Sequence, residues 1–257
     1  MRLDSYLAER GLAKSRSRAR ALIEAGLVTV NGRPAEKPSH EVSDGDDVRV
    51  TGEDHPFVGR GGVKLDAALD RFAIDVRGLV CADVGASTGG FTDCLLQRGA
   101  GKVWAVDAGH GQLDPALRAD PRVVNLEGIN ARTLSPKLIP EPCGLAVLDL
   151  SFISQTLALP AVKTVLAPEG LYVGLVKPQF ECGRAALGGG GIVRDRKMHL
   201  LAVRRVLSCL DECGLGAIGL MKSPVKGGDG NTEFLICAKA GVPRTLTDRD
   251  AAEVTAS

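Results

Sequence analysis

The chain has 257 residues, of which 44% are hydrophobic and 25% charged, and its formal net charge at pH 7 is +1. This length fits a small domain joined to a larger one, and the composition argues against overall disorder. Aromatic residues make up only 4% of the chain. The core must therefore be built mainly from Ala, Val, Leu and Ile, a composition that suits helices packed on a parallel sheet.

Membrane spans, secretion and metal binding find little support in the sequence. The longest uncharged run, residues 150–162, is shorter than the roughly 18 apolar residues of a spanning helix. The first residues, MRLDSYLAERG, lack the apolar core of a signal peptide, so we expect a cytoplasmic protein with reduced thiols. The seven cysteines include no C-x-x-C motif and the four histidines are scattered. We therefore expect buried free thiols and no metal site.

Residues 1–55 form the first predicted domain. Apolar residues at helical spacing predict two short helices, the second capped by Ser15 and ended by Gly26. Asn31-Gly32 is a tight-turn dipeptide between alternating apolar and polar residues, which indicates a hairpin. The expected unit is two helices followed by a small sheet.

The second predicted helix is basic. Lys14, Arg16, Arg18 and Arg20 occur with no acidic residue among them, so their side chains could contact several phosphates at once. A solvated helix face is the alternative explanation. However, RLDSYLAERGLAKSRSRARALIEAGLVTVNG closely resembles the RNA-binding domain named after protein four of the small ribosomal subunit. This resemblance implies docking on structured RNA, so we predict that these four residues bind RNA.

Residues 62–240 form the second predicted domain, and residues 56–61 are the expected linker. Alternating apolar runs and helical stretches predict an α/β, Rossmann-like fold with a doubly wound parallel sheet. The segment LVCADVGASTGGFTDCLLQRGA is typical of a strand, a glycine-rich loop and a helix, and KVWAVDAG of the next strand. Asp107 ends that strand, in the position from which a carboxylate reaches the ribose hydroxyls of a bound nucleoside. The pattern therefore predicts an adenosine-type cofactor.

The glycine-rich loop favours S-adenosylmethionine. Its sequence, GASTGG, lacks the G-x-G-x-x-G pattern that holds a pyrophosphate, and S-adenosylmethionine has no phosphate. A structural turn that needs positive φ is the alternative. We expect Asp83 to organise the loop, small residues to let the backbone approach the methionine portion, and two hydroxyls to bind it. The predicted cofactor site consists of Asp83, Gly85, Ser87, Thr88, Gly89, Gly90, Phe91 and Asp107.

Four charged residues stand near predicted strand ends or on the entering helix. Asp149 and Lys177 follow buried strands, and the ligand crevice of an open α/β sheet lies beyond the carboxyl ends of its strands. Glu233 begins another strand, and Lys64 lies on the helix that enters the domain. An ordinary salt bridge or surface charge would explain each residue alone. Together they suggest a functional set.

Several motifs resemble one enzyme family. RGGVKLDAAL, DVGASTGGFTDCLLQRGA, DLSFIS, LVKPQFE, GGIVRD and SPVKGGDGNTEFL are similar to the haemolysin A (TlyA) family of ribosomal RNA 2′-O-methyltransferases. The resemblance covers residues 1–240 and leaves 241–257 as a C-terminal tail. It implies an RNA-binding domain joined to a methyltransferase domain with a K-D-K-E active site. The implied catalytic residues are Lys64, Asp149, Lys177 and Glu233.

The resemblance also implies a substrate and a division of roles. The substrate would be a ribose, from the family a cytidine, in ribosomal RNA or a ribosomal subunit. A sulfonium-bound methyl is already activated, so the enzyme must align a hydroxyl and remove its proton. Lys177 is the candidate base, although a free lysine has a pKa of about 10.4. We assign Asp149 and Glu233 to fixing Lys64 and orienting Lys177.

Three alternative classes have less support. A nicotinamide oxidoreductase would need the dinucleotide loop, which is missing. An RNA-binding protein without catalysis would not need the complete set of four charged residues. A membrane-active haemolysin would need a spanning or strongly amphipathic segment, and the sequence offers none.

Overall fold

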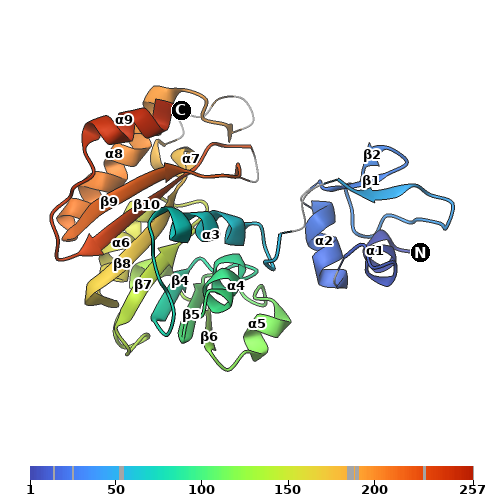
Figure 1. The fold of residues 1–257 in the computed structure, drawn as a ribbon, viewed down its shortest axis with the longest axis horizontal. Coiled ribbons are helices and arrows are strands. Elements are labelled where there is room, and N and C mark those ends of the chain that lie inside the picture. Colours follow the sequence, from blue (N-terminus) through green and yellow to red (C-terminus); the bar gives the residue numbers. More distant parts are fainter. Residues whose placement is uncertain are drawn as a thin grey trace. The chain divides into compact units, whose positions relative to one another are not determined.

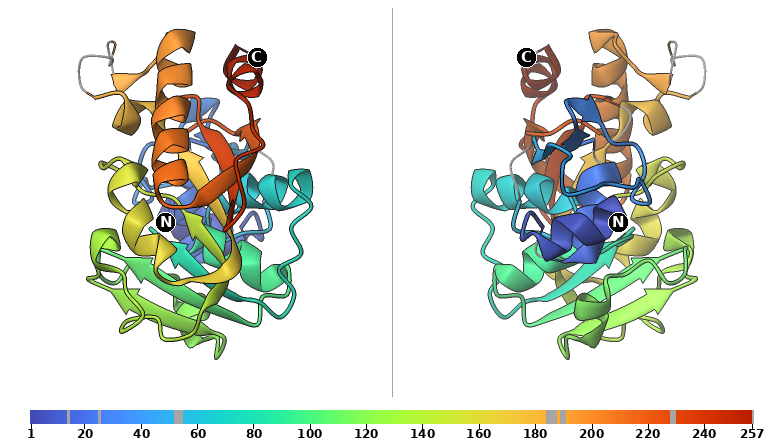
Figure 2. Two further views of the ribbon diagram at one scale, coloured as in Figure 1. Left: turned by 90° about the vertical axis from the view of Figure 1, so that its left-hand side faces the viewer. Right: turned by 90° about the vertical axis from the view of Figure 1, so that its right-hand side faces the viewer.

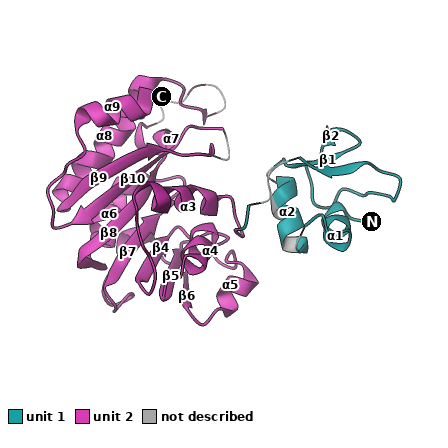
Figure 3. Cartoon of the chain, viewed as in Figure 1, with its two compact units in different colours: residues 1–56 teal, residues 57–257 magenta. Residues whose placement is uncertain are grey.

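The chain folds into two compact units, residues 1–56 and residues 57–257 (Figures 1 and 3). The computed structural model describes residues 1–13, 15–24, 26–51, 55–183, 188, 191–227 and 230–256. Each unit has its own buried apolar clusters, so each is treated by itself below.

Unit 1 consists of two helices and a small antiparallel sheet. Its elements are α1 (Leu3–Glu9), α2 (Arg16–Glu24), β1 (Val28–Val30), β2 (Arg33–Pro34) and β3 (Val48–Val50), with strand order β2-β1-β3. Ser15 Oγ accepts a hydrogen bond from the Arg18 amide at 3.1 Å, as expected of an N-cap. Asn31 and Gly32 both have positive φ, 52° and 76°, which is the backbone of a two-residue hairpin turn. The local elements of the first domain thus follow the sequence pattern.

Unit 2 is a mixed sheet covered by helices. Among the described residues its strands are β4 (Val80–Val84), β5 (Lys102–Asp107), β6 (Val123–Glu127), β7 (Cys143–Leu148), β8 (Leu166–Val176), β9 (Leu215–Lys222) and β10 (Phe234–Ala240). Its helices are α3 (Gly61–Arg71), α4 (Gly90–Gln97), α5 (Pro115–Ala119), α6 (Leu159–Lys163), α7 (Pro178–Glu181), α8 (Arg196–Glu212) and α9 (Asp248–Ala256), with short 3-10 turns at Ala131–Thr133 and Gln155–Leu157. The strand order is β6-β5-β4-β7-β8-β10-β9, and β10 is antiparallel to both of its neighbours.

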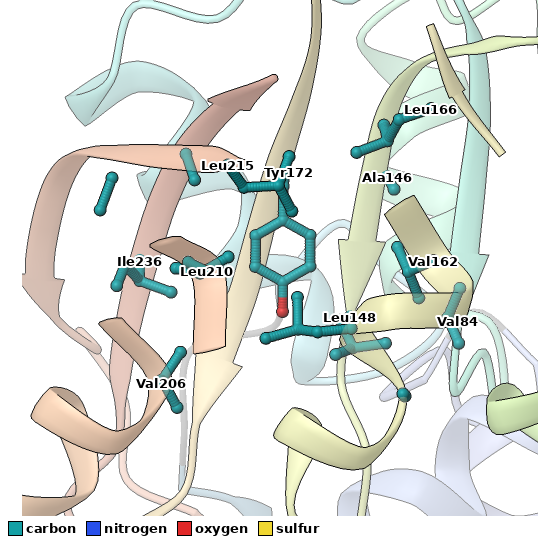
Figure 4. Close-up of a cluster of buried hydrophobic side chains, with 14 of the residues drawn as sticks. Val84, Ala146, Leu148, Val162, Leu166, Tyr172, Val206, Leu210, Leu215 and Ile236 are labelled. Carbon is teal, nitrogen blue, oxygen red and sulfur yellow. The ribbon is translucent and has the colours of Figure 1, made fainter. Parts of the chain in front are cut away.

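The two faces of the sheet are buried under different helices. Alternate side chains of a strand point to opposite faces, so Ala82 and Val84 pack in the cluster that includes residues of α6 and α8. Cys81 belongs instead to the cluster that includes residues of α3 and α4. In Figure 2, α8 is the long orange helix that runs across one face. On that face Tyr172 is fully buried among Leu148, Leu210 and other apolar side chains (Figure 4).

The topology locates a ligand crevice. From the central strand β4 the chain runs outward through β5 and β6, then returns to add β7 and β8 on the other side. The order therefore reverses between β4 and β7, and ligands of such sheets bind outside the carboxyl ends of the strands at this switch point. The predicted fold class, a Rossmann-like α/β unit preceded by a small α+β unit, is confirmed.

The segment expected to be a tail is part of the second unit. Residues 248–256 form α9, which contacts α8 and β9, and Ala251 on this helix is fully buried. All seven cysteines lie in the described part of the chain as free thiols, four of them buried. Within that part, no helix is long and apolar enough to cross a membrane.

Candidate functional site

Two lysine–carboxylate pairs lie at the carboxyl edge of the sheet. Lys177 Nζ is 2.5 Å from Asp149 Oδ1, and Lys64 Nζ is 2.5 Å from Glu233 Oε2. Lys64, Lys177 and Glu233 are all buried, with exposed fractions of 7%, 8% and 2%. Buried charged groups are costly unless they are paired, so each carboxylate holds its lysine in place as one half of an ion pair.

Strand pairing brings three of these four residues to one edge. Asp149 follows β7 directly, and its amide donates to the Val84 carbonyl at the end of β4. Lys177 follows β8, and Glu233 precedes β10, whose first residue, Phe234, pairs with Val176. Because β10 runs antiparallel, its beginning lies beside the end of β8. Lys64 comes from α3 and completes the second pair.

A cavity of about 450 Å³ opens beside the Asp149–Lys177 pair. Its walls come from the ends of β4, β5 and β7, as the switch point predicts. Among its lining residues are Gly85, Ser87, Asp107, Gln112, Asn130 and Asp149. A second cavity, of about 150 Å³, is lined by Gly59, Arg60, Gly61, Gly85, Ala86, Ser87, Thr88, Gly90, Phe91 and Asp149. Asp149 therefore lines both cavities and holds Lys177.

The glycine-rich loop passes very close to β7. Gly85 has φ of +90°, and a Cβ built on it would lie 2.3 Å from the Asp149 carbonyl oxygen. Gly89 has φ of +100°, but its Cβ would meet Leu113 and Leu117 of the apolar core. Gly89 lines neither of the two cavities. A side chain is therefore excluded at the two positions by different neighbours. Gly85 lies against Asp149 at the site, whereas Gly89 lies against apolar side chains of and next to α5.

The two predicted acidic residues of the cofactor site are already engaged. Asp107 accepts from the amides of Ser87 at 2.8 Å and Gly109 at 2.7 Å, so it fixes the loop in addition to lining the larger cavity. Asp83 is fully buried and accepts from Thr92 Oγ1 at 2.6 Å, whereas its Oδ1 has no partner in the described part of the chain. Burial raises the pKa of Asp83 from 3.8 to about 7.

Sequence reasoning missed several residues at the site. Ser151 Oγ accepts a hydrogen bond from Lys177 Nζ at 3.0 Å and lines the larger cavity. Phe152, also on its wall, is 88% exposed with φ of 70°, and its ring centroid lies 5.6 Å from that of Phe180. The DLSF motif placed both next to Asp149, but exposure and positive φ are not visible in a sequence. Gln112 and Asn130 gave no sequence signal.

The basic residues of unit 1 are held by other groups of that unit. Arg16 and Arg20 both contact the fully buried Asp4, with Nε to Oδ2 distances of 3.2 and 3.4 Å. Arg18 donates to the His55 carbonyl at 3.0 Å. Lys14 lies outside the described residues. The sequence predicts that these cations bind RNA from one helix, but it does not indicate the acceptors within unit 1.

Comparisons with known proteins agree with both units. The profile described as FtsJ-like methyltransferase matches residues 57–240, and that of the S4 domain matches residues 1–48. The 16S/23S rRNA (cytidine-2′-O)-methyltransferase TlyA of Mycobacterium tuberculosis H37Rv is 45% identical over 247 residues, covering 96% of this chain and 92% of the relative.

Two further relatives carry a different name. Hemolysin A of Brachyspira hyodysenteriae is 41% identical and covers 91% of this chain and 98% of its own length. A solved structure of a candidate hemolysin from Streptococcus thermophilus is 40% identical, with a TM-score of 0.80, covering all of this chain and 94% of that one. The full-length match extends through both units.

Proposed function

The chain belongs to the FtsJ-like methyltransferase family, and from this premise we propose that it transfers a methyl group from S-adenosylmethionine to a ribose 2′-hydroxyl of cytidine in ribosomal RNA. Support for the substrate comes from the relative of M. tuberculosis named for this reaction and from the S4 domain match. The protein is a methyltransferase of a Rossmann-like fold. The cofactor, the nucleotide and the residue roles are the proposal.

One observation carries the proposal. Asp149 lines both cavities at the switch point and holds Lys177 at 2.5 Å. A cofactor bound in the larger cavity is thereby next to a lysine that an ion pair with Asp149 and a hydrogen bond to Ser151 fix in position. A cofactor site and a candidate base thus share one wall.

The larger cavity fits an adenosine-type cofactor. Its volume of about 450 Å³ lies within the range of small-molecule sites. The close approach at Gly85, where a Cβ would collide with the Asp149 carbonyl, packs the loop backbone against the end of β7 on the wall of this cavity. Asp107 and Asn130 on the walls supply acceptors and donors for ribose and base. Ser87 and Thr88 remain the proposed hydroxyl partners of the methionine portion.

The chemistry assigns different work to the two lysines. When bound, S-adenosylmethionine supplies a methyl group already activated by its positive sulfur, so no acid is needed. Lys177, in its neutral form, accepts the proton of the 2′-hydroxyl on Nζ, and Asp149 retains the resulting ammonium. Glu233 fixes Lys64, whose positive charge stabilises the negative charge that develops on the attacking oxygen.

The proposal is tested by methylation of ribosomal RNA. Subunits and naked RNA from a strain that lacks the gene are incubated with the protein and labelled S-adenosylmethionine, and the modified position is mapped. We expect label on a cytidine ribose. Label on a base would overturn the 2′-O assignment, and failure of every RNA to accept label would overturn the substrate class.

A further inference from the structure

Asp4 is a buried carboxylate with an unusual number of cationic neighbours. It lies in the first turn of α1 with no exposed surface. Arg2 binds it through two hydrogen bonds of 3.0 Å, from Nε to Oδ1 and from Nη2 to Oδ2. Arg16 and Arg20 of α2 reach Oδ2 at 3.2 and 3.4 Å. We refer to Arg2, Asp4, Arg16 and Arg20 as the Asp4 cluster.

The cluster leaves guanidinium groups facing solvent. The side chains of Arg2, Arg16 and Arg20 are 41%, 56% and 56% exposed, whereas Asp4 is buried beneath them. A guanidinium has five N–H donors, so one or two bonds to Asp4 leave most donors for another anion. Hydrogen bonds from Arg2, followed by those from Arg16, hold the pKa of Asp4 well below its usual range. Three positive charges on one carboxylate give the cluster a net charge of +2.

Such an arrangement suits phosphate recognition better than three independent arginines. A long flexible side chain loses rotamer freedom when it binds, and this loss weakens affinity unless the bound geometry is already formed. In the Asp4 cluster a shared acceptor orders Arg2, which precedes α1, and two arginines of α2 before any ligand binds. Each arginine still has N–H groups that do not bind Asp4, and a guanidinium can bind a phosphate through two such groups.

We propose that Asp4 is a positioning residue that presents Arg2, Arg16 and Arg20 as one preformed site for backbone phosphates of structured RNA. The proposal rests on the proposed function, since it names how unit 1 holds that RNA. It adds Arg2, which the sequence pattern on α2 did not indicate. It also assigns a binding role to an acidic residue, which a simple count of charges would treat as unfavourable for RNA.

The test uses a substitution for which charge and geometry predict opposite results. Asp4→Asn keeps the side-chain size and raises the net charge by one, so nonspecific electrostatics predicts tighter binding. Loss of the negative charge and of one of the two acceptor oxygens predicts weaker binding instead, by about tenfold or more, the order expected when charge-assisted bonds lose their fixed geometry. The probe is the full-length protein with 16S and 23S rRNA transcripts at several salt concentrations.

Asp44→Asn is the matched control. Asp44 lies in the same unit, is exposed and pairs with Arg10, so its replacement makes the same charge change away from the cluster. We expect Asp44→Asn to bind RNA as tightly as the unmodified protein or more tightly. If Asp4→Asn folds and binds like Asp44→Asn, Asp4 does not position the arginines and the proposal is wrong.

Lysine variants keep the test valid if Asp4→Asn does not fold. Arg16→Lys preserves the charge but cannot bind Asp4 and a phosphate with one planar group. Arg49→Lys is its control, because Arg49 is also an exposed partner of a carboxylate, Asp47. We expect only Arg16→Lys to weaken RNA binding severalfold, and equal affinities of the two variants would overturn the proposal. If the unmodified protein binds neither rRNA, the proposed function fails as well, which separates the two outcomes.

Discussion

Lys177 is held by an ion pair with the Asp149 carboxylate and by a hydrogen bond to the Ser151 hydroxyl. Lys177→Ala removes the proposed base without touching the glycine-rich loop or unit 1. We expect the variant to bind S-adenosylmethionine and rRNA but to transfer methyl at least about a hundredfold more slowly, the low end for loss of a general base. Calorimetry measures cofactor binding, and single-turnover incorporation of label measures the chemical step.

Lys177→Arg distinguishes a base from a positioning cation. Arginine keeps the positive charge near Asp149 but is not deprotonated in proteins. We expect the arginine variant to be as slow as the alanine variant, whereas an electrostatic role would restore part of the rate. Substantial single-turnover activity of Lys177→Arg would mean that Lys177 positions the hydroxyl and that another group receives the proton.

Asp83 makes the stability of unit 2 depend on pH. Its pKa is raised from 3.8 to about 7, chiefly by burial. In the folded chain the carboxyl is neutral below that value, while in the unfolded chain it ionises from about pH 4. Its contribution to the free energy of unfolding therefore falls between about pH 4 and pH 7, and stays low above pH 7.

Replacing Asp83 with Asn should remove this dependence, since the amide keeps the shape and cannot ionise. In urea unfolding, we expect Asp83→Asn to gain stability relative to the unmodified protein on going from pH 5 to pH 8, by up to about 3 kcal/mol, since about two units of the shift fall between pH 5 and pH 7. Asp75→Asn is a control without pH dependence in this range, because pairing with Arg77 lowers the pKa of Asp75 to about 2, so its contribution changes only below about pH 4. A difference that does not grow with pH would show that Asp83 is ionised in the folded protein.

At the scale of the elements, the junction of β4 with α4 depends on a close approach at Gly85. Gly85→Ala places a methyl 2.3 Å from the Asp149 carbonyl, so the loop or the end of β7 must move. We expect loss of measurable S-adenosylmethionine binding and a methyl-transfer rate reduced at least as far as in Lys177→Ala. Calorimetry and the single-turnover assay test both expectations.

Gly78→Ala is the matched control for Gly85→Ala. Gly78 also has positive φ, +71°, but a Cβ there meets nothing within 4 Å. Both substitutions place an alanine at positive φ, at a cost of roughly 1 kcal/mol, whereas only Gly85→Ala also collides with the Asp149 carbonyl. Equal cofactor affinities for the two variants would mean that Gly85 serves only as a turn.

For the glycine-rich loop, the sequence predicts the local elements but not the contacts of Gly85 and Gly89. The pattern GASTGG correctly located a strand, a tight loop and a helix, because glycine and small residues are required there locally. What each glycine touches depends on segments far away in the chain, β7 for Gly85 and α5 for Gly89. A branched residue at Gly89 should therefore disturb core packing first, whereas the sequence pattern predicts that Gly89 belongs to the cofactor site.

At the scale of the whole molecule, only part of the arrangement of the two lysine–carboxylate pairs could be predicted, because the rest depends on the order of the strands. Asp149 and Lys177 end parallel strands of the kind that the apolar runs predict, so their shared edge could be foreseen. Glu233 reaches that edge because β10 inserts antiparallel between β8 and β9. That order depends on long-range pairing, and the choice of partner, Lys64 for Glu233 and Lys177 for Asp149, follows from it.

The acceptors of the arginines in unit 1 could not be predicted from the sequence either. Their clustering at Arg16, Arg18 and Arg20 was visible in the sequence, but their acceptors lie outside α2, on Asp4 and on His55. Helix packing brings Asp4 of α1 to them, and packing contacts of this kind leave no local pattern. The count of exposed cations alone would therefore overstate how freely these side chains move.

The division into two units predicts that RNA binding and cofactor binding can be changed separately. Replacing Arg16, Arg18 and Arg20 together with Gln should weaken rRNA binding and reduce the slope of log affinity against log salt by up to about 2 to 3, since each lost phosphate contact removes 0.7 to 0.9. S-adenosylmethionine affinity should not change, because the proposed cofactor residues all belong to unit 2.

Two measurements test this separation of RNA binding from cofactor binding. Fluorescence titrations at salt concentrations from about 50 to about 300 mM measure the slope for rRNA binding, and calorimetry measures the affinity for S-adenosylmethionine. An unchanged slope in a folded variant would mean that these arginines serve the structure of unit 1, and that the RNA is held by other parts of the chain.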